Sequence, residues 1–199
     1  MSSPSVWETL HATDETSMNL EDRQLDLGEG PTIDAFVHGG PVLVSDVDSP
    51  EARARWPIFV ADASANGVRA MFALPVQVGA IRLGALNLHR STPGSLNTDQ
   101  ISDALAFADA ACALLLAEAE GGTHTGAADD IWHREDHSAH QGEVHQATGM
   151  VLVQLGVSAE IALSRLRAFA FRHGRPLGDV ARDVVERRLR FNPDDEEAG

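Results

Sequence analysis

The sequence contains no lysine and a single cysteine, and it has no long uninterrupted apolar run. Cys112 alone excludes an internal disulfide and any cysteine-based metal motif. No segment approaches the roughly 18 consecutive apolar residues that a membrane helix needs. The first residues also lack the basic-then-apolar pattern of a signal peptide. These absences predict a cytoplasmic protein without a membrane anchor.

The absence of lysine leaves arginine as the source of all 15 formal cations, against 30 acidic residues. Arginine suits bidentate contacts to phosphate, but a GC-rich genome produces the same bias, and we prefer this simpler explanation. The distribution of charge is more informative. Residues 1–139 carry 7 arginines and 21 acids, whereas residues 140–192 carry 8 arginines and 5 acids. A basic segment on an acidic chain is expected where that segment alone meets a polyanion.

The sequence offers little for catalysis, which needs a nucleophile, an acid–base pair or a metal. No segment has the spacing of a P-loop, a dinucleotide fingerprint or a nucleophile elbow. Cys112 lies on the apolar face of an alanine-rich segment, where a thiol usually behaves as a small hydrophobic side chain. We therefore predict that the protein is not an enzyme, has no catalytic residues and needs no cofactor.

Three histidines, His133, His137 and His140, have the spacing of one helix face. Imidazoles arranged in this way can hold Zn²⁺ or Ni²⁺ across a dimer, or can respond to pH near 6. A solvated polar face explains them more simply, because the sequence shows no further ligand beside them. The prediction is that there is no metal site.

The first 119 residues show a mixed α/β pattern. Strands are predicted over 42–44, 70–76 and 81–88, with residues 69–88 forming a hairpin that turns at Gly79-Ala80. A helix is expected to begin at Ser49-Pro50 and run to about Phe59. A long helix capped by Asn97 should follow. The apolar face predicted for this last helix contains Ile101, Leu105, Cys112, Leu115 and Leu116.

After a polar stretch over 121–130, the pattern is entirely helical. A first helix is predicted over 131–155 and should end at Gly156. A second begins at Ser158 and ends near His173-Gly174, and a third begins at Pro176. The apolar stripe of this third helix consists of Val180, Val184, Val185 and Leu189. Three helices of these lengths predict a small all-α bundle.

The segments Q-A-T-G-M-V-L-V-Q-L-G-V-S-A-E-I-A-L-S-R-L-R-A-F-A and R-P-L-G-D-V-A-R-D-V-V resemble the ANTAR domain of bacterial transcription antitermination regulators. The resemblance covers about 140–192. It rests on Ala147, Gly149, Leu155, Gly156, Ala162, Leu166, Arg167, Ala170, Leu177, Val180 and Ala181. The resemblance implies a three-helix module that binds paired stem-loops in nascent mRNA leaders and prevents formation of a terminator hairpin.

Each of the two short helices is expected to bury an apolar face and to present arginines on the other. Guanidinium groups bind phosphates and stack on unpaired bases. The second helix is expected to present Arg165, Arg172 and Arg175, and the third Arg182, Arg187, Arg188 and Arg190. Many ANTAR domains carry lysine where this chain has Thr148, while Ala147 and Gly149 are expected to allow close helix approach. The candidate RNA contacts are Arg165, Arg167, Arg172, Arg175, Arg182, Arg187 and Thr148.

The segments L-G-E-G-P-T-I-D-A-F, P-V-L-V-S-D, R-W-P-I-F and L-G-A-L-N-L resemble a GAF sensory domain of the subtype that precedes ANTAR modules in actinobacterial regulators. The resemblance covers about 20–118. It implies an antiparallel sheet flanked by helices and a small-molecule or redox input, although one cysteine cannot run the reductase cycle of some GAF-fold proteins. Compared with the family, the first helix and strand are expected to be missing, with 6–10 as one surviving strand, leaving the sheet partly uncovered.

The sequence thus predicts an α+β GAF-like domain over 1–119, a linker and start of a signalling helix over 120–139, an all-α ANTAR domain over 140–192 and a disordered acidic tail over 193–199. The predicted function is RNA-binding transcription antitermination. The expected partners are mRNA leader hairpins, a second copy of the chain in a homodimer, and an unknown small-molecule or protein input. The alternatives are a DNA-binding regulator, since helix–turn–helix is compatible with the pattern, and an interaction module without nucleic acid.

Overall fold

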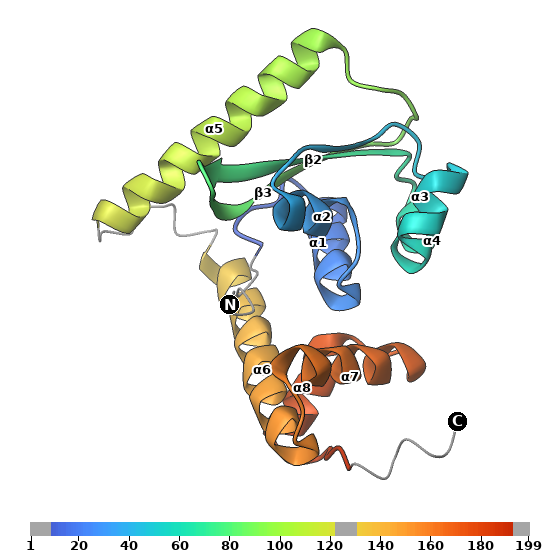
Figure 1. Cartoon of the computed structure of the whole chain (residues 1–199), viewed down its shortest axis with the longest axis vertical. Helices are drawn as coiled ribbons and strands as arrows, with labels where there is room; N and C mark the ends of the chain where they lie inside the picture. Colours follow the sequence, from blue (N-terminus) through green and yellow to red (C-terminus); the bar gives the residue numbers. More distant parts are fainter. Residues whose placement is uncertain (1–8, 122–130, 193–199) are drawn as a thin grey trace. The chain divides into compact units, whose positions relative to one another are not determined.

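The structure, a computed structural model, describes residues 9–121 and 131–192, with the side chains of 118–121 and 131–141 left aside. The chain divides into two compact units (Figure 1). We call His11–Thr125 the N-terminal unit and Gly126–Gly199 the C-terminal unit, to which Met1–Leu10 are assigned. The side chains of His133, His137 and His140, the tail 193–199 and most of the expected strand at 6–10 lie outside the description. Thr9 and Leu10 belong to no strand.

The N-terminal unit combines helices with an antiparallel sheet of three strands in the order β1-β2-β3. The predicted strands and hairpin are confirmed, and Gly79 takes the left-handed conformation in the turn, with φ 57°. The unit therefore has an α+β architecture. Its elements are α1 (Glu15–Leu27), α2 (Pro31–His38), β1 (Val42–Val44), α3 (Pro50–Arg55), α4 (Pro57–Ala65), β2 (Ala70–Val78), β3 (Ile81–Arg90) and α5 (Thr98–Gly121).

Both faces of the central strand β2 are covered by helices. Figure 1 shows α5 along one face of the hairpin and α1 and α2 on the other. On the α5 side, Leu74 and Val76 pack against Ala104, Ala108 and Cys112. A strand covered on both faces carries a continuous apolar run, which explains the sequence A-M-F-A-L. The core on the other side contains Leu20, Val47, Ala52, Trp56, Phe59, Val60, Ala63, Val68 and Met71.

The buried face of α5 differs from the prediction. Ala104 and Ala108 are buried, whereas Leu105 and Leu116 are 42% and 40% exposed. Cys112 is buried as expected. Small alanine side chains let the helix approach the sheet closely. The alanine face is therefore the one that packs on the sheet, in place of the face richer in leucine.

The helix predicted from Ser49 to Phe59 is in fact two helices, because Pro57 restricts the residue before it to non-helical backbone. Trp56 accordingly has φ −135° and ψ 68°. Its indole is buried in the core, as predicted, and donates a hydrogen bond to Asp34 Oδ2 over 3.1 Å. Trp56 cannot cap α4 with its side chain. Instead, Glu29 Oε1 accepts hydrogen bonds from the backbone N–H groups of Ile58 (2.9 Å) and Phe59 (2.8 Å).

The expectation that the first helix is missing is wrong, because α1 precedes the G-E-G-P motif. Asp14 caps α1 by accepting from the Ser17 amide over 2.7 Å, and Gly28 ends it in the left-handed conformation. These local signals form a helix despite its weak apolar periodicity. The predicted turn function of Gly28, Gly30 and Pro31 is confirmed, since Pro31 is the first residue of α2.

Four polar residues form a cluster between α1, α2 and β3. Gln24 is completely buried; its Nε2 donates to Thr32 Oγ1 over 2.9 Å, and the Thr32 amide donates back to Gln24 Oε1 over 2.8 Å. Glu21 Oε1 accepts from Gln24 Nε2 and from Asn87 Nδ2, over 3.1 and 2.5 Å. Burial raises the pKa of the Glu21 carboxyl to about 7, although hydrogen bonds from Asn87 and Thr32 oppose this shift.

The C-terminal unit contains the three predicted helices: α6 (Ile131–Leu155), α7 (Ala159–Arg172) and α8 (Leu177–Val185). Gly156, with φ 66°, ends α6, and the Ser158 hydroxyl caps α7 by accepting from the Ile161 amide. Both signals act as the sequence predicts. The core that joins the helices consists of Ala147, Val151, Ala162, Leu166, Ala170, Leu177, Val180, Ala181 and Val184.

Helix α8 is shorter than its predicted apolar stripe. It ends at Val185, and Arg187 takes the left-handed conformation with φ 62°. The backbone N–H groups of Arg188 and Leu189 then both donate to the Asp183 carbonyl, over 2.7 and 3.0 Å. Leu189 still packs against the core, but from the segment after the helix. The prediction that the third helix presents Arg187, Arg188 and Arg190 is therefore wrong. These arginines lie on the segment that follows α8.

Candidate nucleic-acid interface

Helix α7 separates its core residues from its arginines. Ala162, Leu166 and Ala170 are buried, whereas Arg165 and Arg172 are exposed. Because these arginines are seven residues apart, they lie on one side of the helix, about 10 Å apart along its axis. Phe171 lies away from the buried face and is 61% exposed. The outer surface of α7 thus offers two cations and an aromatic ring.

A single carboxylate, that of Asp183, holds two further arginines. Arg175 Nη2 lies 2.6 Å from its Oδ2, and Arg188 Nε lies 2.7 Å from its Oδ1. The hydrogen bonds from Arg175 and Arg188 lower the pKa of Asp183. Arg188 also pairs with Glu186. The chain before α8 and the chain after it are therefore brought together by one side chain, and so are their guanidinium groups.

An aromatic cluster brings the end of α7 to the segment that follows α8. The Phe169 ring stacks on His173 with centroids 4.0 Å apart and meets Phe191 edge-on at 5.5 Å. The Phe191 amide also donates to Gln154 Oε1 over 2.9 Å. Arg172 and Arg190, which are sequence neighbours of this cluster, consequently lie at the same end of the bundle. Within the part of the chain that the structure describes, neither forms an ion pair.

Arg182 differs from the arginines at this end. Its Nε lies 3.2 Å from Glu143 Oε1 on α6, and its Nη1 lies 3.5 Å from Asp179 Oδ1. The side chain is partly buried between the two helices. Arg182 therefore holds α8 against α6.

A comparison with family models decides the identity of this bundle: the model of the ANTAR domain matches residues 135–185. Residues 135–185 form an ANTAR domain. At the level of the family, this domain is a regulatory RNA-binding module of transcription antitermination and is not enzymatic. The match covers most of α6 and all of α7 and α8, and the N-terminal unit lies outside it.

No curated protein matches the sequence. Among solved structures, the chain has a distant likeness to the type II free methionine-R-sulfoxide reductase from Thermoplasma acidophilum, at 18% identity and a TM-score of 0.34. This likeness covers 44% of the chain and 57% of the length of the reductase. A likeness of this size carries no argument about fold or activity.

The three residues of the A-T-G run, Ala147 to Gly149, have different environments in the structure. Thr148 is 7% exposed, and its hydroxyl donates to the Val144 carbonyl of the same helix over 2.7 Å. The hydroxyl is thus occupied within the helix, as is common for threonine in helices. Ala147 is buried in the bundle, as predicted, but Gly149 is exposed and a methyl group there would meet nothing within 4 Å. The prediction that Gly149 allows another helix of this chain to approach closely is therefore wrong.

The structure thus brings only some of the candidate RNA-contacting residues to one end of the ANTAR domain. Arg172 and Arg175 lie at one end of the ANTAR domain, with Arg187 just beyond α8, while Arg165 extends the row along α7. Arg167 is partly buried on α7. Phe171 is not among the contacts predicted from the sequence. Its helical spacing places it off the face formed by Ala162, Leu166 and Ala170, and this spacing could have indicated that its ring is exposed.

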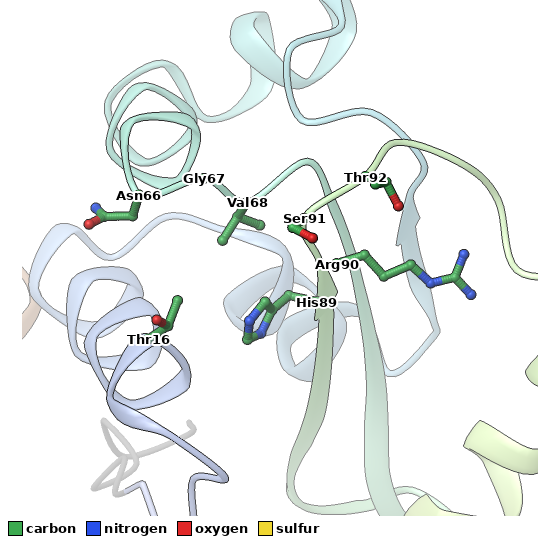
Figure 2. Close-up of a pocket in the computed structure, with 8 residues that line it drawn as sticks. All are labelled: Thr16, Asn66, Gly67, Val68, His89, Arg90, Ser91 and Thr92. Carbon is green, nitrogen blue, oxygen red and sulfur yellow. The ribbon is translucent and has the colours of Figure 1, made fainter.

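Two open hollows lie on the part of the N-terminal unit that the structure describes. Figure 2 shows the first, of about 480 Å³, between the start of α1, the loop before β2 and the end of β3. The His89 ring points toward Thr16, whereas the Arg90 side chain points away from it. The second, of about 660 Å³, runs along β1 and α3 and includes Trp56 and Arg55. Among the described residues, no group of three or more His, Cys, Asp or Glu is arranged to hold a metal ion.

Proposed function

We propose that the protein is an RNA-binding transcription antitermination regulator whose ANTAR domain binds paired stem-loops in mRNA leaders. The observation that carries this proposal is the gathering of arginines at the end of the ANTAR domain where α7 ends. Arg172, Arg175 and Arg190 lie at this end and are proposed as contacts. Arg165, about 10 Å back along α7, and Arg187, in the segment after α8, are proposed with them. Arg182 and Arg167 are assigned to positioning, and Thr148 is left out because its hydroxyl is buried.

Phe171 is proposed to stack on an unpaired base of the RNA loop. Sequence-specific RNA binding depends on aromatic side chains and guanidinium planes that receive splayed bases. Phe171 is the large aromatic side chain that α7 exposes, and Arg172 follows it directly. A phenyl ring 61% exposed on a helix is otherwise unfavourable in water.

We further propose that the N-terminal unit is a GAF-like input domain and that the regulator acts in the cytoplasm as a homodimer, so that two ANTAR domains meet two stem-loops. The contacts between the motifs that carry the GAF resemblance support this assignment. Glu29 of G-E-G-P caps the helix that begins in R-W-P-I-F, and Arg55 lies 2.6 Å from Asp34. The input, a small molecule or a protein, would act on this unit.

The direct test is titration of the full chain with a leader RNA bearing two hairpins, the same RNA with one hairpin, and duplex DNA of matched length. We expect the two-hairpin RNA to bind tightest at moderate salt. Equal or tighter binding to the duplex would favour a DNA-binding regulator. Binding to none of the three would leave an interaction module without nucleic acid.

Arg172→Ala and Arg187→Ala should each weaken RNA binding by about two- to tenfold. Each should also reduce the slope of log affinity against log salt by about 0.7–0.9, the value for one lost phosphate contact. Affinities measured at four or more salt concentrations give both quantities. The matched control is Arg53→Ala, which removes an exposed arginine from the N-terminal unit and should leave the slope unchanged.

Asp183→Asn should strengthen RNA binding by a similar factor, because it removes a negative charge and releases Arg175 and Arg188. If the released Arg188 then reaches a further phosphate, the salt slope steepens by about 0.7–0.9. The bundle should become less stable at neutral pH, since a carboxyl whose pKa is lowered on folding contributes stability above its unfolded pKa. Glu160→Gln removes a charge from the same domain without releasing an arginine; an equal gain in affinity from this control would contradict the explanation.

A further inference from the structure

Helix α5 is more apolar than its packing requires. Over Thr98–Ala117 its mean hydropathy is 1.5, yet only 17% of that window is buried. By length and composition alone it could cross a membrane, which no uninterrupted apolar run in the sequence indicated. One face lies on the sheet through Ala104, Ala108 and Cys112. The remaining surface of the helix is what needs an explanation.

A second stripe runs along the exposed side of α5. Phe107 and Leu114 are 66% and 68% exposed, and Ala110 and Ala117 are exposed between and beyond them. These four residues, which we call the outer stripe, follow spacings of three, four and three. This is the heptad spacing by which two helices pair in a coiled coil.

The outer stripe is complementary to itself when two copies run antiparallel. In an antiparallel pair, each a position faces a d position of the other helix. Aligning Phe107 with Ala117 of the other copy then places Ala110 opposite Leu114. Every contact layer combines a large with a small side chain, which lets the helices approach closely and fills the space between them. A parallel pair would instead place Phe107 on Phe107 and Ala110 on Ala110.

The charges of α5 also select the kind of partner. Over Thr98–Ala117 the helix carries Asp99, Asp103 and Asp109 and no cation. In the antiparallel alignment Asp103 falls opposite Gly121, whereas a parallel pair would bring the two copies of Asp103 together. A helix without cations does not attract RNA or an acidic lipid surface. Because both copies of this helix carry only acidic charges over this range, pairing between them must depend on apolar contact.

We propose that α5 pairs antiparallel with α5 of a second copy of this chain through the outer stripe. The inference rests on the proposed homodimer and gives it an interface. A C2 interface of this kind is isologous, since the same surface serves both copies. Figure 1 shows the turn of the β2–β3 hairpin at the C-terminal half of α5, and Ile81 and Val78 there are 66% and 47% exposed.

The first test measures the mass of the full chain by sedimentation at several concentrations. Wild type is expected to dimerise, and Leu114→Glu should raise the dissociation constant at least tenfold. Leu105→Glu is the matched control, because Leu105 is 42% exposed on the same helix but lies off the outer stripe. Circular dichroism melting of each variant shows that it folds. A monomeric wild type, or a Leu114→Glu variant that dimerises as wild type does, would overturn the proposal.

The second test measures the direction of the pair by thiol crosslinking. In the antiparallel pair, Phe107→Cys/Ala117→Cys should crosslink through residues 107 and 117 of different copies, as read from peptide masses. Neither single variant should do so, since its two copies are separated by about 15 Å along the axis. Crosslinking by the single variants would show a parallel pair and overturn the alignment.

Two further measurements separate this proposal from its competitors. Because both copies are acidic, dimerisation should strengthen as salt rises, whereas RNA binding weakens. Loss of RNA binding with the dimer intact would contradict the proposed function and leave this interface standing. The wild type could instead sediment with neutral lipid vesicles and form no dimer. If Leu114→Glu then abolished the vesicle binding, the outer stripe would bind a membrane and the proposal would be overturned.

Discussion

Replacing Gly30 by alanine is expected to lower the free energy of unfolding of the N-terminal unit by about 3–5 kcal/mol. Gly30 has φ 138°, a conformation that residues with a side chain rarely adopt. A methyl group there would lie 2.3 Å from Gln24 Oε1 and 2.6 Å from its Cγ. Gln24 cannot move aside without cost, because it is completely buried and exchanges two hydrogen bonds with Thr32. The substitution thus combines backbone strain with the loss of buried hydrogen bonds.

Urea unfolding followed by tryptophan fluorescence measures this effect, since Trp56 is buried in the same unit. Gly40→Ala is the matched control: a methyl group at Gly40 meets nothing within 4 Å, so its midpoint should stay close to that of wild type. The double variant Gly30→Ala/Gln24→Ala should be less harmful than the sum of its single changes, because the collision disappears. Strict additivity would show that Gln24 is not the obstacle.

Glu21 is expected to make the N-terminal unit less stable as pH rises through neutrality. Its pKa is about 7 in the folded unit against 4.5 for the free group. Between these values the folded state holds the proton more firmly than the unfolded state, so the stabilisation is complete below pH 4.5 and is lost as pH rises through 7. The full difference corresponds to about 3 kcal/mol.

Glu21→Gln should remove most of this dependence and should stabilise the unit at pH 8. Glutamine keeps an oxygen that can accept from Asn87 and Gln24 but never carries the charge whose burial is costly. Urea unfolding at pH 5, 6, 7 and 8 gives the comparison. Glu15→Gln on the exposed side of the same helix serves as the control. A profile for Glu21→Gln parallel to that of wild type would assign the dependence to other groups.

Local signals explain why so much of the fold could be predicted. The hairpin needed only two apolar runs and the turn at Gly79 between them, and α7 needed only the cap at Ser158 and the glycine before it. The bounds of α6 and α7 agree with the prediction for the same reason. By contrast, the sequence predicts one helix over α3 and α4, because the apolar run W-P-I-F continues across the position where Pro57 forces Trp56 out of helical backbone.

The errors at the candidate site have a tertiary origin. Nothing near Arg175 in sequence indicates that Asp183, eight residues away, will bind it together with Arg188. Likewise, α8 ends at Val185 although the apolar spacing continues to Leu189, because Leu189 reaches the core from a turn. The spacing of apolar residues predicts which side chains are buried in the core. It does not predict whether the backbone that carries them is a helix or a turn.

The cap of α4 has a consequence for the synthesis of the chain. The carboxylate that accepts the first amides of α4 belongs to Glu29, which precedes Ile58 by 29 residues. The ribosome therefore makes the cap before the helix that uses it. When residues 57–65 leave the exit tunnel, Glu29 has already left it. The acceptor for the first amides of α4 is therefore available as soon as this helix begins to form.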